Sequence, residues 1–364
     1  MITNAIVKAD LRNIHEALGL RPRWNEAVIL VTGCAGFLGF YLTQYLVRYA
    51  GELGIRKVIG LDTFLLGKSR WLLELAEESP SLFSVQSFDI SKDRIEDVEE
   101  AKAARYVIHA ASIASPTFYR QHPVETIDAN VWGLRRLLDF YKDAEGLEGF
   151  LFFSSSEIYG DPDAQSIPTE EAYRGNVACV GPRACYDESK RFGETLCYVF
   201  ATSYGMPITI TRPFNNYGPG MRTGDNRLPA DLAEAVLGRR DITLWSDGSP
   251  SRTYCYISDA VAGYFLCLLH GKYDYFNIGS DTQEMAVREL AELYRATGAE
   301  MFGYPGKIRY AKSEDPAYLT DNPSRRCPDI RKAREKLGYN PTIAVEEGVR
   351  RHLQFLSDEG VGEA

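Results

Sequence analysis

The sequence predicts an α/β fold in which a doubly wound parallel sheet is followed by a smaller C-terminal α/β lobe. Short apolar segments alternate with amphipathic segments between Val28 and Arg212, as expected when helices cover both faces of a parallel sheet. A glycine-rich turn follows the first apolar segment, and an aspartate ends the second. After Arg212 the alternation gives way to shorter segments among Gly, Pro and Asp turns, which indicates a second lobe.

The same patterns give the individual elements. We expect strands over residues 28–32, 57–61, 83–88, 105–109, 149–154 and 207–212, and helices over 38–50, 69–78, 123–143 and 186–204. In the second lobe we expect helices over 226–237, 258–270 and 286–297 and isolated strands over 242–245 and 275–278. The chain then has three parts, namely an N-terminal helical extension (1–27), a first domain (28–212), and a region (213–364) that is mainly the second lobe, with some segments returning to the sheet. The helix expected over 5–18 is either a docking or oligomer arm or a packed extension.

The first turn contains Gly33, Gly36 and Gly39 in a G-x-x-G-x-x-G spacing. A strand, a tight turn and a helix in this order let the backbone approach a pyrophosphate, and the helix N-terminus offers free N–H groups at the positive end of its dipole. We assign Phe37 and Leu38, which open the helix, to the same site. The usual fingerprint is G-x-G-x-x-G, so the first glycine comes one residue earlier here. The motif predicts a Rossmann-type dinucleotide site.

Asp62 ends the second apolar segment, roughly twenty residues after the glycines. A carboxylate at this position accepts a hydrogen bond from a ribose 2′-hydroxyl. Thr63, Phe64 and Leu65 follow, and none of them is an arginine that would pair with a 2′-phosphate. The pattern predicts NAD in preference to NADP, the alternative being an aspartate that only caps a turn.

Tyr186 and Lys190 lie four residues apart in the helix expected over 186–204. Residues at this spacing share a helix face, so we expect the Lys190 ammonium near the Tyr186 phenol, where it favours the ionised form. A phenolate beside a nicotinamide is a base for a sugar hydroxyl. Such pairs are common in helices, but one that follows a dinucleotide motif predicts a catalytic site.

Three serines and a glutamate, residues 154–157, lie at the end of the strand expected over 149–154. Ligands of parallel sheets bind at the carboxyl ends of the strands, so we expect these side chains at the cofactor. A serine cluster is often only a turn. Its place at a strand end favours a functional interpretation.

Together these motifs resemble those of the extended short-chain dehydrogenases/reductases that act on nucleotide sugars. The resemblance runs from Val28 to about Leu353 and includes residues 89–90, 109–112, 212–219, 252–259 and 276–279. It implies a catalytic triad of Ser155, Tyr186 and Lys190, and a homodimer in which helices 123–143 and 186–204 form a four-helix bundle. It also implies that the cofactor contacts Asp89, Ile90, Ala110, Ala111, Ser112 and Pro213, beside Tyr186 and Lys190.

Within this family, the site is most similar to that of the UDP-glucuronic acid decarboxylases. In sugar 4,6-dehydratases the position of Ser156 is an aspartate that protonates the departing 6-hydroxyl, and a serine is a poor donor at neutral pH. Residues 181–191 and the loop 114–119, whose Tyr119 would reach the sugar, agree with the decarboxylases. So does Thr253, which stands where the dehydratases and 4-epimerases have an acid that would repel a carboxylate. Ile113, where many decarboxylases have proline, leaves the identity of the sugar open.

The resemblance also implies substrate contacts from the second lobe. Arginine pairs bidentately with diphosphate and with carboxylate groups, so Arg252 is expected on either of them and Arg326 on the diphosphate. Asn215 is expected to donate to the diphosphate. Trp245 is expected either to stack on the nucleobase or to pack in the core.

These residues lead to the hypothesis of a redox-neutral decarboxylation of a nucleotide-linked uronic acid. Tyr186, with Ser155, would take the proton of the C4 hydroxyl, and the resulting C4 ketone would allow the C6 carboxylate to leave as carbon dioxide. UDP-glucuronate would give UDP-xylose, or the 4-keto pentose if the hydride is not returned. Ser156 and Glu157 would contact the sugar, which Glu157 either orients or protonates at C5 through a relay. The alternatives are a 4-epimerase, a 4,6-dehydratase and a non-catalytic NAD sensor, which would not need the Tyr186 and Lys190 pair.

Composition narrows the partners and the compartment. A net charge of −9 argues against a nucleic-acid-binding surface, and no apolar run reaches the roughly 18 residues of a membrane span. The 7 cysteines include no C-x-x-C pair, and the 5 histidines show no metal-ligand spacing, so we expect no metal. Reduced thiols in a cytoplasm fit this composition.

Overall fold

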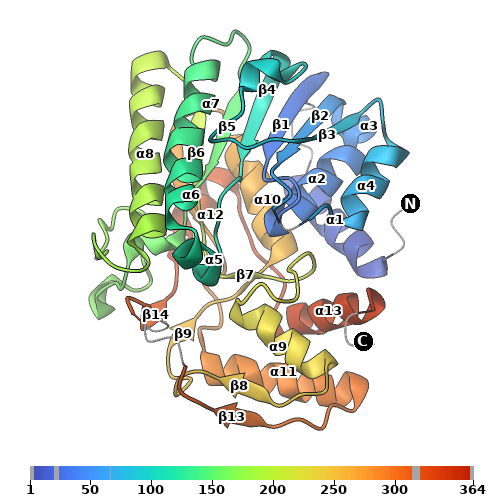
Figure 1. The fold of residues 1–364 in the computed structure, drawn as a ribbon, viewed down its shortest axis with the longest axis vertical. Coiled ribbons are helices and arrows are strands. Elements are labelled where there is room, and N and C mark those ends of the chain that lie inside the picture. The colour runs from blue at the N-terminus through green and yellow to red at the C-terminus, as the bar shows by residue number, and fades with distance from the viewer. Residues whose placement is uncertain (1–3, 20–23, 66, 314–319, 361–364) are drawn as a thin grey trace.

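The computed structural model describes residues 4–19, 24–65, 67–313 and 320–360. Parts of the predicted extension, including its link at Pro22, lie outside the described residues. The centre is a parallel sheet of 7 strands in the order β11-β6-β5-β4-β1-β2-β3, which confirms the predicted fold class (Figure 1). Its strands are β1 (Ala27–Thr32), β2 (Ile55–Asp62), β3 (Phe83–Ser87), β4 (Ala104–His109), β5 (Gly149–Phe153), β6 (Ile208–Pro213) and β11 (Asp274–Ile278).

Both faces of the sheet are buried, and β1 shows how one apolar strand fills two cores. Val28 and Leu30 pack with α7 (Leu134–Tyr141) and α8 (Ala184–Tyr204). Ile29 and Val31 pack in the other core, with α1 (Ala5–Leu18), α2 (Phe37–Arg48) and α10 (Ile257–Leu268). Successive side chains of a strand point to opposite faces, so a strand covered on both sides is apolar throughout.

Further short elements complete this domain. They are α3 (Ala50–Leu53), α4 (Arg70–Glu78), α5 (Pro116–Gln121), α6 (Pro123–Ile127) and α12 (Arg331–Leu337), with the 3₁₀ turns η1 (Ile95–Asp97), η2 (Ala101–Ala103), η4 (Ser156–Tyr159) and η5 (Ala164–Ser166). The helix expected over 123–143 is not regular, because a π-helical turn, η3 (Asp128–Gly133), separates α6 from α7.

Two elements expected in the second lobe belong to the main sheet instead. The strand expected to be isolated at 275–278 is β11, which pairs in parallel with β6. The helix expected at 258–270 is α10, which packs against β5, β6 and α1. All of its residues from Ile257 to Leu268 are buried, and a helix that is apolar all round needs a covered position.

The second lobe lies below the sheet in Figure 1. It contains α9 (Leu228–Leu237), α11 (Val287–Phe302) and the paired strands β8 (Ile242–Leu244) and β13 (Ile308–Tyr310), with α13 (Val345–Asp358) against α9 and α11. Short strands link the lobe to the sheet: β7 (Asn216–Tyr217) pairs with β10 (Cys255–Tyr256), and β9 (Ser251–Arg252) lies between β12 (Met285–Ala286) and β14 (Arg325–Arg326).

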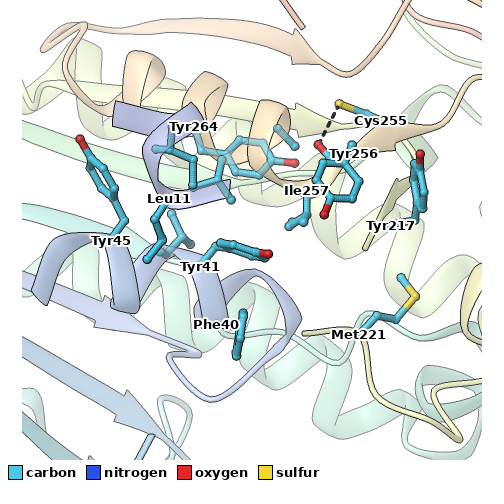
Figure 2. Packing of buried hydrophobic residues seen from close by; sticks show 14 of the residues in the cluster. Leu11, Phe40, Tyr41, Tyr45, Tyr217, Met221, Cys255, Tyr256, Ile257 and Tyr264 are labelled. Carbon is cyan, nitrogen blue, oxygen red and sulfur yellow. Dashed lines mark hydrogen bonds between the residues drawn. The ribbon is translucent and has the colours of Figure 1, made fainter. Parts of the chain in front are cut away.

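The N-terminal helix α1 packs against the rest of the protein, as expected of a packed extension. Leu11 lies among aromatic side chains of α2 and α10 in Figure 2. The buried Asp10 accepts hydrogen bonds from the hydroxyls of Tyr41 and Tyr256 and pairs with Arg351 on α13 at 2.9 Å. The helix therefore joins α2, α10 and α13. None of the described helices is long and apolar enough to cross a membrane.

Candidate active site

A single cavity of about 880 Å³ extends from the glycine turn after β1 to the second lobe. Its size is near the upper end for small-molecule sites. Every site residue predicted from the sequence lines it: Gly33, Gly36, Phe37, Leu38, Gly39, Asp62, Asp89, Ile90, Ala110, Ala111, Ser112, Tyr119, Ser155, Ser156, Glu157, Tyr186, Lys190, Pro213, Asn215, Trp245, Arg252 and Arg326. The fold therefore brings these residues together at the carboxyl ends of the strands, where α/β sheets bind ligands.

The glycine turn is held by close backbone contacts. Gly33 has φ +74°, and a Cβ atom there would lie 2.8 Å from the backbone of Ala110. A Cβ at Gly39 would lie 2.4 Å from the carbonyl oxygens of Gly33 and Cys34, so this glycine lets α2 approach the turn. No side chain caps α2 at Gly36, which leaves the first N–H groups of the helix to a ligand.

Asp62 lies at the end of β2, on the wall of the cavity. Its carboxylate accepts hydrogen bonds from the backbone N–H of Ala35 at 3.0 Å and of Phe64 at 2.9 Å. The carboxylate is thus fixed beside the glycine turn and keeps lone pairs for a ribose hydroxyl.

The lining fits NAD. Besides the uncapped helix and the fixed Asp62 carboxylate, the buried hydroxyls of Ser112 and Ser154 have no hydrogen-bond partner in the part of the chain that the structure describes. Buried polar groups normally have partners, so these two hydroxyls at the ends of β4 and β5 are suited to a polar ligand. Of the described residues, no three His, Cys, Asp or Glu side chains form a group that could hold a metal ion.

Tyr186 and Lys190 lie on one face of α8, with the Lys190 ammonium 5.7 Å from the centre of the Tyr186 ring. The ammonium donates to the Phe153 carbonyl at 2.8 Å, and burial lowers the pKa of Lys190 to about 7. Burial also raises the pKa of Tyr186, against the smaller effect of a hydrogen bond with Ser155. Desolvation is thus the largest influence on Tyr186 and disfavours the phenolate, while the expected effect of Lys190 on its ionisation stays a prediction.

The π-helical turn η3 holds α8 in place. Asn130 donates from Nδ2 to the Ser189 hydroxyl at 2.9 Å, and that hydroxyl donates to the Tyr186 carbonyl at 2.9 Å. Asp128 and Ala129 of the same turn line the cavity. Such turns inside α-helices are frequent at functional sites. Asn130 was not among the residues predicted from the sequence, since apolar periodicity does not reveal a π-helical turn.

Glu157 lies at the centre of a cluster of charges on the cavity wall. Arg326 pairs with both of its carboxylate oxygens at 2.6 Å, and Arg183 pairs with one of them at 2.6 Å. These two guanidinium groups hold the pKa of Glu157 well below its usual range although the side chain is largely buried. Glu157 is therefore an ionised group here and has no proton to donate.

A third buried arginine, Arg252, faces the same cluster. It lies on β9 directly opposite Arg326 on β14. Its guanidinium donates to backbone carbonyls, among them that of Pro323 at 2.6 Å. Burial and the neighbouring Arg326 lower the pKa of Arg252 to about 10. Among the described residues, no carboxylate pairs directly with Arg252, which suits an anionic ligand.

Tyr119 and Arg183 complete this part of the cavity wall. The Tyr119 ring stacks on that of Tyr186, with 4.9 Å between centres, and its buried hydroxyl has no hydrogen-bond partner among the residues described. The Arg183 guanidinium lies 5.9 Å from the Tyr119 ring. No role was predicted for Arg183 from the sequence, although it lies in the stretch 181–191 and three residues before Tyr186.

Trp245 and Asn215, the residues expected to contact the nucleotide, also line the cavity. Trp245 is 42% exposed on the cavity wall, so it is not a core residue. Asn215 donates to the Thr253 carbonyl at 2.9 Å, and its left-handed backbone (φ +41°) turns the chain away from the end of β6. Both residues lie on the cavity wall as expected for nucleotide contacts, and the contacts themselves stay predictions.

A model of the NAD dependent epimerase/dehydratase family matches residues 29–279. The chain belongs to this family. It is an NAD-dependent enzyme of the extended short-chain dehydrogenase/reductase type, as its motifs predicted, and NAD is its cofactor.

Named relatives agree with the decarboxylase resemblance. UDP-glucuronic acid decarboxylase 1 of Arabidopsis thaliana is 33% identical over 340 residues, which cover 92% of this chain and 72% of the relative. UDP-glucuronic acid decarboxylase 6 of the same plant is 33% identical over 325 residues, with 88% and 86% covered. UDP-glucuronic acid decarboxylase 1 of Xenopus tropicalis is 31% identical over 335 residues, with 91% and 72% covered.

Solved structures of a sugar-nucleotide epimerase and of a dehydratase have the same fold. The UDP-glucose 4-epimerase of Thermotoga maritima, solved with UDP-glucose, has a TM-score of 0.75 and 26% identity, with 91% of this chain and 99% of that chain covered. A dTDP-glucose 4,6-dehydratase of Streptomyces venezuelae, solved with NAD, has a TM-score of 0.77 and 24% identity, with 91% and 97% covered, and shows the fold alone.

Proposed function

We propose that this enzyme decarboxylates a nucleotide-linked uronic acid, with UDP-glucuronate as the substrate. The observation that carries the proposal is the charged part of the cavity wall, where three buried arginines (183, 252 and 326) surround Glu157 and where Ser156 replaces an acid. A substrate with a diphosphate and a carboxylate needs such an excess of cations. The relatives named UDP-glucuronic acid decarboxylase support the same substrate.

The residues around Tyr186 suit oxidation at C4. Bound NAD supplies a hydride acceptor and donor at the sugar ring. Tyr186, hydrogen-bonded to Ser155 and stacked on Tyr119, is the group that takes the C4 hydroxyl proton. The positive charge of a nicotinamide would favour the phenolate that burial alone disfavours.

The C4 ketone makes loss of the carboxyl group possible. It lies β to the C6 carboxylate, so the C5–C6 bond breaks, its electron pair moves into the ketone as an enolate, and carbon dioxide leaves. The hydroxyls of Tyr186 and Ser155 can donate to the enolate oxygen. Loss of water from C6 would instead need a proton donor, and both candidates are unsuitable: Ser156 is a weak acid and Glu157 is ionised by its two arginines.

The test is incubation of the purified protein with UDP-glucuronate and NAD. We expect carbon dioxide together with UDP-xylose or the 4-keto pentose, identified by NMR and mass spectrometry. A C4-inverted hexuronate without carbon dioxide would instead establish a 4-epimerase, and turnover of a neutral nucleotide hexose with loss of water would establish a dehydratase.

The role of the tyrosine can be tested by substitution. Tyr186→Phe removes the base, and we expect turnover to fall by about 10²–10⁴-fold. The matched control is Tyr198→Phe, an exposed tyrosine of the same helix, which should retain full turnover. Normal activity of the Tyr186→Phe variant would contradict the mechanism.

We also propose that the enzyme is a homodimer through α6, α7 and α8, which lie side by side on one flank in Figure 1. Exposed apolar side chains on this flank support it: Val124, Ile127, Trp132, Phe192 and Val199. Exposed apolar patches commonly mark interfaces. Sedimentation should give a dimer, and Phe192→Asp with Val199→Asp should give a folded monomer; a wild-type monomer at micromolar concentration would contradict this.

The compartment proposed is the cytoplasm. All 7 cysteines are unpaired, and most of them are buried. Structural disulfides are rare in reducing compartments, so unpaired thiols support this assignment.

A further inference from the structure

A buried carboxylate that the mechanism does not use lies directly behind the arginine cluster. Asp187 follows Tyr186 on α8, and its side chain is 7% exposed. One of its oxygens lies 3.8 Å from Arg183 Nε, while the other oxygen and that Nε have no hydrogen-bond partner within the described ranges. Arg183 and Glu157 line the cavity, and Asp187 lies outside its lining.

The guanidinium of Arg183 therefore lies between two carboxylates. Its Nη2 donates to Glu157 at 2.6 Å, and its Nε faces Asp187. With Arg252 and Arg326, the cluster has three cations, and Glu157, Asp187 and the nearby Asp321 are the carboxylates of the described residues that act on it. Protonation of Asp187 removes one of these negative charges without changing any group that lines the cavity.

A surplus of positive charge has opposite effects on binding and on decarboxylation. It stabilises the substrate carboxylate in the ground state. When the C5–C6 bond breaks, the electron pair moves toward the C4 oxygen and the carboxyl group becomes neutral carbon dioxide, so this stabilisation is lost as the reaction proceeds. An interaction that is stronger in the ground state than in the transition state slows the chemical step.

We propose that Asp187 is a positioning residue that restrains Arg183 and weakens the hold of the arginine cluster on the substrate carboxylate. The inference rests on the proposed decarboxylation and gives a role to a residue that does not contact the substrate. Asp187 holds Arg183 from the side away from the cavity and leaves one edge of the guanidinium to Glu157 and the substrate.

Asp187 acts in this way only when it is ionised. Burial and the nearby Glu157 raise the pKa of Asp187 to about 7, against the opposing effects of Arg183 and Arg326. The other titratable groups that face it are Asp321, Tyr119, Cys185 and Tyr186. Assays at pH 8.5 therefore keep the wild-type carboxylate ionised.

The experiment is steady-state kinetics of carbon dioxide release from UDP-glucuronate by Asp187→Asn, a nearly isosteric neutral variant, at pH 8.5. We expect KM to fall by about threefold to tenfold and kcat to fall by about tenfold, because a loss in both parameters reports ground-state stabilisation. A purely structural role would lower kcat without lowering KM, or would raise KM. An unchanged or raised KM, or an unchanged kcat, would overturn the inference.

Two further variants control the result. Glu188→Gln removes a carboxylate from the next residue of α8, which is partly exposed and pairs with Arg191, and it should leave both constants unchanged. Asp187→Glu keeps the charge and should restore most of kcat; failure to do so would overturn the inference, and it serves as the test if Asp187→Asn does not fold. Wild-type protein that releases no carbon dioxide would refute the proposed function itself, which separates the two failures.

The pH dependence gives an independent measurement. Between pH 8.5 and 6, KM and kcat of the wild type should both fall toward the values of Asp187→Asn, while the variant should not show this step. A step of equal size in both proteins would assign the titration to another group and contradict the inference.

Discussion

Asp10 and Glu157 are both largely buried carboxylates, but they have opposite electrostatic surroundings. Asp10 is 0% exposed and has two tyrosine hydroxyls and one arginine as partners. Burial raises its pKa above the ordinary value, because these partners only partly offset desolvation. Glu157 has two arginines in direct contact and a third nearby, and its pKa is lowered.

The difference shows how a buried charge serves structure in one place and chemistry in another. The Asp10 network joins α1, α2, α13 and the strand β10 that precedes α10, and none of its four side chains lines the cavity. The Glu157 network lines the cavity and contains more cations than carboxylates in direct contact. An excess of buried cations beside a cavity predicts an anionic ligand, whereas a balanced network between helices predicts a structural role.

The largest expected effect is on stability at Asp10. Asp10→Ala leaves two buried tyrosine hydroxyls without their partner and removes one of the two carboxylates that pair with Arg351, so it should lower the free energy of unfolding by about 2–4 kcal/mol. Urea unfolding measures it, with Lys8→Ala, at an exposed position of the same helix, as the control. A loss below about 1 kcal/mol would show that α1 is only weakly attached.

Glu157 should affect activity instead. Glu157→Gln removes the group that fixes Arg183 and Arg326, and small displacements of groups that position a substrate cost about a hundredfold in rate. We expect that loss in kcat/KM, while Asp10→Asn, assayed where it is folded, should stay within about twofold of the wild type. Equal losses in both variants would remove the distinction between the two networks.

The two networks should also respond to pH with opposite signs. The raised pKa of Asp10 means that the folded protein favours its protonated form, so this contribution to stability is lost as the pH rises above the ordinary value of 3.8. The lowered pKa of Glu157 gives a contribution that is present above 4.5 and lost as the pH falls.

Relative to the wild type, Asp10→Asn should therefore gain stability and Glu157→Gln should lose stability as the pH is raised from 3 to 6. The slope for each is at most about 1.4 kcal/mol per pH unit. Urea unfolding at several pH values measures both variants, and slopes of the same sign would contradict the assignment.

The smallest expected effect is at Asn13, beside the Asp10 network. Its amide donates to Ser258 at 3.0 Å and to Asp259 at 3.2 Å at the start of α10. Asn13→Ala should cost about 1 kcal/mol of unfolding free energy with unchanged kcat/KM. A larger effect on activity than on stability would show that α1 also influences the site.

The sheet and the cofactor turn were predictable because their signals are local. Apolar segments with turns between them gave six of the sheet's strands, and the glycine spacing with Asp62 gave the NAD site. The seventh strand, β11, follows a long excursion through the second lobe, and nothing in residues 274–278 says which neighbour they pair with. The raised pKa of Tyr186 was not predictable for a similar reason, since the extent of burial depends on distant residues.

The sequence by itself determined the fold class, the NAD-binding turn and the Tyr186 and Lys190 pair, because each depends on spacing within one strand, turn or helix. Only the tertiary structure decided which charges meet. Arg183, Arg252 and Arg326 come from the start of α8, from β9 and from β14, and they surround Glu157 because β9 and β14 pair beside the end of β5. The pKa values at the site result from this packing, since desolvation and the distances between charges exist only in the folded chain.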